Sequence, residues 1–119
     1  MLNVEGRLRS HIQKSLGVPA FVAVPRDMPA GRFATVERTG GDTRTKVSER
    51  ATVVVDWWGA SRADAFELAT EGDEAVMAFV RENGVAKVSV TSACAHMPDV
   101  ESRRERYEST YSIVIYKEV

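Results

Sequence analysis

Hydrophobic residues recur every four positions near the start of the chain, which is typical of a one-sided amphipathic helix. Val4, Leu8, Ile12 and Leu16 fall on one face, and polar residues occupy the positions between them. Gly17 follows directly and suits the left-handed conformation that commonly ends a helix. The pattern therefore predicts a first helix over residues 4–16.

Five later segments have the alternation or the short apolar runs of β-strands. FATVER alternates between apolar and polar residues, and ATVVVDWW follows it after a polar stretch. A short apolar run precedes them and ends at Pro25, and two more alternating segments lie near the C-terminus. The predicted strands span residues 20–24, 33–38, 51–58, 86–91 and 107–117.

A second helix is expected to begin after Ser61, which can accept backbone N–H groups as an N-cap, with Asp64 in the first turn. Asp73 interrupts the apolar face of this helix beside Gly72. We expect a bend at Gly72, because an unpaired buried carboxylate is costly. The alternative is that Asp73 reaches the core edge and finds a partner. The expected apolar face consists of Phe66, Ala69, Val76, Met77 and Val80.

These elements follow one another in the order α-β-β-β-α-β-β. Such an order predicts an α+β domain with a largely antiparallel sheet of about four to five strands and two helices packed on one face. With 119 residues, the chain has the size of one domain, and we assign residues 1–119 to it.

The sequence TGGDTRTKVSER, near residues 39–50, separates the second and third predicted strands. It is too long and too polar for a tight two-residue turn, so we interpret it as a protruding hairpin loop that contacts a partner. The alternative is a mobile connection without a partner. The candidate interaction residues here are Gly40, Gly41, Asp42, Arg44 and Lys46.

A second long loop, near residues 92–106, is rich in charge. Its cations beside an aromatic ring suggest a phosphate-binding patch, but interleaved glutamates favour a solvated loop of ion pairs. The alternative is that this loop contacts DNA that passes through a ring-shaped assembly of several copies of the chain. The candidate residues are Arg103, Arg104, Arg106 and Tyr107.

Trp57 and Trp58 lie together at the end of a predicted strand. Alternation along a strand points one ring into the core and the other outward. Because the following Gly59-Ala60 turn is small, we expect the outer ring, assigned to Trp58, to be an exposed interface anchor. Ordinary exposed apolar surface is the alternative.

Composition narrows the classes of partner. The 16 basic and 17 acidic residues give a net charge of −1, so no global field attracts nucleic acid or an anionic membrane. No apolar run approaches the ~20 residues needed to span a bilayer. The single Cys94 allows no internal disulfide, and the N-terminus lacks a secretory apolar region. We therefore expect a protein partner and a cytosolic chain.

Candidate catalytic and metal-binding groups are sparse. Cys94 and His96, followed by Asp99 and Glu101, offer zinc ligand types but not the spaced pairs of a structural site. The Gly-Gly pair near residue 40 lacks the Lys-Ser or Lys-Thr of a phosphate loop. We expect no enzyme, no catalytic residue, no cofactor and no metal. A small ligand-binding or enzymatic α+β domain is the minor alternative.

The order and spacing of several short motifs resemble the tail-terminator and tail-completion (minor tail) proteins of long-tailed bacteriophages and prophages. The likeness covers nearly the whole chain, although none of the motifs is specific alone. The family often has a proline before the last motif, where this chain has Glu105. The motifs are the prolines at 25 and 29, Arg38 with Gly40-Gly41, Gly59-Ala60-Ser61, and Arg106-Tyr107.

The resemblance implies a non-enzymatic virion structural protein that caps the tail tube and joins it to the neck. Proteins of this family act as six-fold rings, so the implied partners are further copies of the chain as a hexamer, the tail-tube protein and a neck or connector protein. DNA would pass through the lumen without sequence-specific binding. The implied location is the virion, and the host bacterial cytoplasm before assembly. Another head-tail joining component, such as a head-closure or connector protein, is the alternative.

Overall fold

The computed structural model describes residues 2–117 and confirms the α+β class and the predicted order of elements. Its helices are α1 (Val4–Leu16) and α2 (Arg62–Ala78), and a short 3-10 turn, η1 (Phe79–Arg81), extends α2. Its strands are β1 (Ala20–Phe21), β2 (Phe33–Thr43), β3 (Ser48–Gly59), β4 (Val85–His96) and β5 (Glu105–Tyr116).

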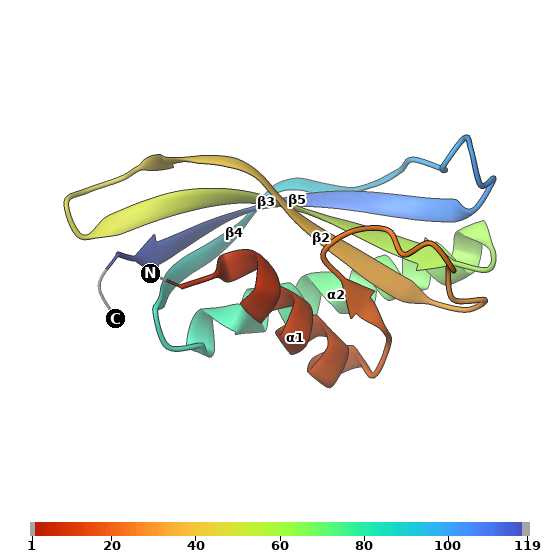
Figure 1. Ribbon diagram of the computed structural model, residues 1–119, viewed down its shortest axis with the longest axis horizontal. Helices are drawn as coiled ribbons and strands as arrows, with labels where there is room; N and C mark the ends of the chain where they lie inside the picture. Colours follow the sequence, from red (N-terminus) through yellow and green to blue (C-terminus); the bar gives the residue numbers. More distant parts are fainter. Residues whose placement is uncertain (1, 118–119) are drawn as a thin grey trace.

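The five strands form one sheet in the order β1-β2-β3-β5-β4. β1 pairs with β2 in parallel over two residues, and all other neighbours are antiparallel. α1 and α2 pack side by side on one face of the sheet, which we call the helical face (Figure 1). Within residues 2–117, the opposite, outer face of β3, β5 and β4 carries no helix. The molecule extends over 43 × 25 × 23 Å.

Both helices begin at local signals in the sequence, and α1 also ends at one. The Asn3 side chain accepts a hydrogen bond from the Gly6 amide at the start of α1, and Gly17 closes that helix with φ of 67°. The Ser61 hydroxyl accepts a bond from the Asp64 amide, so the predicted N-cap of α2 is confirmed. The core lies between the helices and the sheet and includes Leu8, Ile12, Leu68, Val76 and Ile113.

The expected bend in α2 is wrong, because the helix is continuous from Arg62 to Ala78. Gly72 is buried against β3, and a Cβ atom there would overlap the Trp57 ring. Its missing side chain lets the helix approach the indole closely. Asp73 accepts a hydrogen bond from the Tyr111 hydroxyl, which is the partner that the alternative required.

The predicted apolar face of α2 is right for Ala69 and Val76 and wrong for Phe66, Met77 and Val80, which are 48%, 41% and 42% exposed. The buried face is rotated toward small residues, namely Ala65, Ala69, Gly72 and Ala75 together with Leu68 and Val76. Small residues let α2 lie close to the sheet, and the larger apolar side chains then line its flank.

Candidate assembly surfaces

β2 and β3 form a long hairpin that reaches one end of the molecule, and we call its outer part, residues 40–52, the arm (Figure 1). Residues 40–43 pair with residues 49–52, and β3 also pairs with β5 as far as Ser48 opposite Tyr116. Only the turn at residues 44–47, the arm tip, therefore lies outside the strands. The strands pass a bulge between Arg38 and Gly40. Gly41 has φ of 152°, and a Cβ there would collide with the Arg50 carbonyl oxygen, so this position requires glycine.

The arm tip combines cations with one apolar side chain. Arg44 and Lys46 are exposed and precede Val47, which is 61% exposed. The Thr45 hydroxyl accepts bonds from the Val47 and Ser48 amides at 3.2 and 3.0 Å, and these bonds hold the turn. Thus Gly40, Gly41 and Asp42 of the predicted site lie in the paired strands, and its two cations lie at the tip.

The predicted charged loop is shorter in the structure, where β4 runs to His96 and β5 begins at Glu105, leaving a connection over residues 97–104. This connection lies at the end of the molecule opposite the arm (Figure 1). Arg104 donates to the Pro29 and Gly31 carbonyl oxygens at 2.8 and 3.1 Å, and so ties the connection to the segment after β1. Arg103, with φ of 61°, is exposed.

The expectation that one tryptophan ring is exposed is wrong, although the two rings do lie on opposite faces of the sheet. Trp57 is fully buried under α2, and Trp58 is 1% exposed on the outer face. The Trp58 ring stacks on Phe33 at 5.1 Å and donates to the Thr35 hydroxyl at 3.1 Å. The Arg106 guanidinium lies 5.0 Å from the Trp58 ring centre. This small outer core leaves Trp58 no free surface.

The predicted arginine patch with a stacking tyrosine does not come together. Arg106 lies on the outer face, where it donates to the Met97 carbonyl oxygen at 2.8 Å. Tyr107 lies on the helical face, where its ring packs on Phe66 and His96 at 5.4 and 5.3 Å. Successive residues of a strand point to opposite faces, so an Arg-Tyr pair in β5 is necessarily split.

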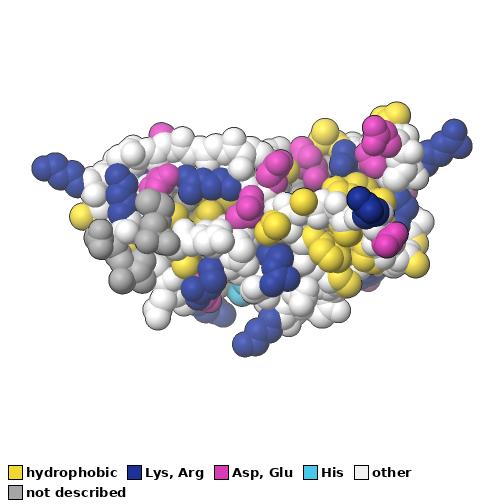
Figure 2. Space-filling view, viewed as in Figure 1, with side chains coloured by type: hydrophobic (Ala, Val, Ile, Leu, Met, Phe, Trp, Pro, Cys, Tyr) yellow, Lys and Arg dark blue, Asp and Glu magenta, His cyan; other side chains and the backbone are white. Residues whose placement is uncertain are grey.

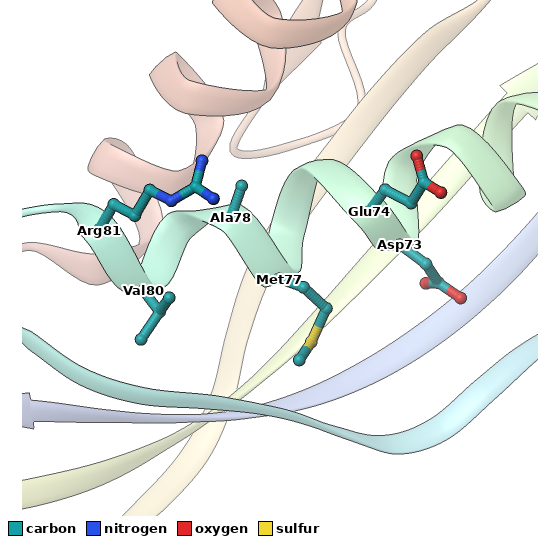
Figure 3. Close-up of a pocket in the computed structure, with 6 residues that line it drawn as sticks. All are labelled: Asp73, Glu74, Met77, Ala78, Val80 and Arg81. Carbon is teal, nitrogen blue, oxygen red and sulfur yellow. The ribbon is translucent and has the colours of Figure 1, made fainter.

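Sequence reasoning missed an exposed flank of α2 and η1. Asp73, Met77 and Val80 point to one side of the helix and Glu74, Ala78 and Arg81 to the other (Figure 3). Together these six residues line an open hollow of about 430 Å³, which we call the α2 groove. Their apolar spacing is visible in the sequence, but on its own it predicts burial in the core.

Two polar groups beside this groove are tied together. The Asp73 carboxylate accepts a hydrogen bond from the Tyr111 hydroxyl. Burial of Tyr111 and this bond raise the pKa of the phenol above its usual value. β4 borders the same region as the last strand of the sheet, and within residues 2–117 its outer edge pairs with no strand. An unpaired edge with exposed Val90 is a surface that another chain can cover.

Membrane-spanning helices and metal clusters are both missing from the described part of the chain. No helix within residues 2–117 is long and apolar enough to cross a membrane. No group of three or more His, Cys, Asp or Glu side chains in that range is placed to hold a metal ion.

The structure thus defines a class of α+β domains in which a five-stranded sheet carries two helices on one face and a hairpin arm at one end. No protein-family model matches the chain, and no curated protein matches it in sequence. Among solved structures, a chain of the "Virion of native gene transfer agent (GTA) particle" is similar in fold, with a TM-score of 0.65 and 15% identity. The match covers 88% of this chain and 84% of that one.

Proposed function

We propose that this chain is a non-enzymatic structural protein of a phage-like virion, where it caps the tail tube and joins it to the neck as a ring of copies. The observation that carries the proposal is the fold match over most of both chains to a chain of a gene transfer agent virion. The motif order near Gly40-Gly41, Ser61 and Arg106-Tyr107 supports the same assignment independently of that match.

A closed ring of identical chains needs two different, complementary surfaces on each copy. The arm tip supplies the first surface, which consists of the exposed Val47 and the cations Arg44 and Lys46. The α2 groove supplies the second, with exposed Met77 and Val80 beside acidic side chains at positions 73 and 74. Apolar surface then meets apolar surface, and cations meet carboxylates.

We therefore infer that the arm tip of one copy lies in the α2 groove of the next. Arg81 also borders the groove, so the acidic end of the groove is the end that accepts Arg44 and Lys46. Cations extend from both ends of the molecule in the view of Figure 2. Exposed Val47 accompanies the cations of the arm tip, and exposed Met97 and Val100 lie in the connection at the other end.

The test is the mass of the purified protein by light scattering across a wide concentration range, with and without the tail-tube protein of the same particle. We expect a six-fold ring, alone or on adding the partner. Met77→Glu should abolish the ring, because it places a charge on the apolar floor. Ala63→Glu, which adds the same charge at an exposed site in the first turn of α2, should not.

A chain that stays monomeric with its partner at high concentration would contradict the proposal. The matched chain is one component of a whole virion particle, so a head-closure or connector role fits the same fold. Capture of a connector protein in preference to the tail-tube protein would favour that second role.

A further inference from the structure

The outer face of the sheet is organised in rows of side chains across three strands. Arg50 of β3 and Lys87 of β4 both pair with Val114 of β5, so the two cations flank one central residue. Ser112 of β5 pairs in the same way with Thr52 and Ser89, which places a row of three hydroxyls beside the cations. Neighbouring strands lie ~4.8 Å apart, so Arg50 and Lys87 are separated by about 10 Å at the backbone.

These rows border an open hollow of about 490 Å³ that lies along the arm. Three cations, Arg44, Arg50 and Lys87, line it together with four hydroxyl side chains and Val114, and no acidic side chain among the described residues lines it. The nearest opposing charge is Asp42, whose carboxylate lies 3.7 Å from the Arg50 guanidinium. That pair is well exposed, at 46% and 62% for the two side chains, so it neutralises Arg50 only weakly.

The chemistry of the hollow suits phosphate groups better than a protein surface. Arginine, lysine, serine and threonine side chains make most protein contacts to nucleic-acid phosphates, and the hollow offers all four types. Its described lining lacks the aromatic or large aliphatic anchor that protein interfaces place at their centres.

The same face becomes acidic toward its other end. Asp56 and Glu108 are paired across β3 and β5, six residues along β3 from Arg50. At about 3.4 Å per residue, the carboxylates lie roughly 20 Å from the cations. Arg106 lies 4.0 Å from Asp56 and offsets part of this acidity. A polyanion is therefore attracted more strongly to the arm end than to the opposite end.

We propose that this basic row, Arg50 and Lys87, binds the phosphodiester backbone of duplex DNA without reading its bases, and that Arg44 adds a third contact in a copy whose arm tip is not seated in a neighbour. The site goes beyond the proposed capping role and lies on residues outside the arginine loop near 103–106. Three phosphate contacts in a free copy give weak binding at physiological salt, and a ring would present the contacts of Arg50 and Lys87 repeatedly.

The experiment measures the anisotropy of a labelled 30-base-pair duplex DNA titrated with the full-length protein, from 20 to 200 mM salt. Three contacts predict a salt slope of about −2.7, which is a loss of roughly 500-fold in affinity over this range. Arg50→Gln combined with Lys87→Gln should bind at least tenfold more weakly at 20 mM salt, with a slope near −0.9.

The matched control is Lys14→Gln combined with Arg26→Gln, which removes the same charge from exposed positions elsewhere. It should keep the wild-type slope and bind within about twofold of the wild type. If the double variant at 50 and 87 does not fold, Lys87→Gln alone should lower the slope by about one. Light scattering on the same samples reports ring assembly separately, so loss of DNA binding with an intact ring bears only on this proposal.

Three results would overturn the inference. The wild type fails to bind DNA at 20 mM salt, or the control pair loses as much affinity as the pair in the hollow. The third is displacement of the DNA by polyglutamate at equal charge concentration, which would identify a carboxylate-rich protein as the occupant.

Discussion

Replacing Asp56 by asparagine should remove a pH-dependent loss of stability. Asp56 lies on the outer face of β3, its side chain is 19% exposed, and among residues 2–117 its Oδ1 atom is buried with no hydrogen-bond partner. Burial, and then the adjacent Glu108 carboxyl, raise the pKa of Asp56 to about 7, with a smaller contribution from Glu37. Arg106 Nε lies 4.0 Å from Oδ1 and only partly offsets this.

The sign follows from the raised pKa of the folded state. The folded protein holds the Asp56 proton up to about pH 7, whereas the unfolded chain releases it near the ordinary value of 3.8. The contribution of Asp56 to stability is therefore greatest below pH 4, falls as the pH rises between these two values, and is level above pH 7. A shift of about three units corresponds to at most ~4 kcal/mol, and proton sharing with Glu108 reduces it to about 2–4 kcal/mol.

The assay is urea unfolding of the wild type and Asp56→Asn between pH 4 and pH 8. Asparagine resembles the protonated acid, so the variant should gain stability over the wild type as the pH rises, reaching about 2–4 kcal/mol at pH 8. Asp42→Asn, at a side chain that is 62% exposed, is the control and should show no such trend. A stability difference between Asp56→Asn and the wild type that is constant from pH 4 to 8 would refute the reasoning.

Three further changes test the packing. Gly72→Ala should destabilise the protein by about 1–2 kcal/mol in urea unfolding, because overlap of the new Cβ with the Trp57 ring (~1–3 kcal/mol) outweighs the ~1 kcal/mol gain in helix propensity. The control is Gly31→Ala, whose Cβ would meet nothing within 4 Å and which should be near neutral. Gly41→Ala should speed hydrogen exchange of the arm amides by roughly tenfold or more, through about 1–3 kcal/mol of local strain, with little change in the core. Arg104→Met should cost about 1–3 kcal/mol and expose residues 22–32 to limited proteolysis.

The sequence was sufficient for the fold class because its local signals agree with one another. The four-residue period at Val4–Leu16 and the Gly17 end signal specify α1 without tertiary information. The alternation of apolar and polar residues likewise specifies the inner parts of β2 and β3. Strand ends were harder to place, because the pairing at residues 40–43 and 48–50 involves polar residues whose periodicity carries no burial signal.

The face of α2 could not be predicted because it depends on the sheet beneath it. Hydrophobicity alone favours burying Phe66, Met77 and Val80, but the space above Trp57 admits only small residues. Helix position is therefore set by side-chain volume across the interface, and the larger apolar residues are displaced to the groove. Gly72, interpreted from the sequence as a point of weakness, is the residue that allows this close packing.

Only part of the candidate site could be predicted from the sequence. The exposure of Arg44 and Lys46 follows from a polar hairpin and could be predicted. The burial of Trp58 could not, because its cover comes from residues far away in the sequence, Phe33 on β2 and Arg106 at the start of β5. An aromatic residue at a strand end is exposed or buried according to which residues the neighbouring strands place beside it, and the sequence pattern does not specify that register.

The distribution of charge gives the strongest reason to consider the two ends of the outer face separately. A net charge of −1 argues against a nucleic-acid partner, yet strand register collects Arg50 and Lys87 at one end of this face and Asp56 and Glu108 at the other. Fields from these groups are screened over about 8 Å at physiological salt, so the two ends behave as independent surfaces. Net charge sums the two ends to nearly zero, so a chain of this composition can still attract an anion at one end of this face.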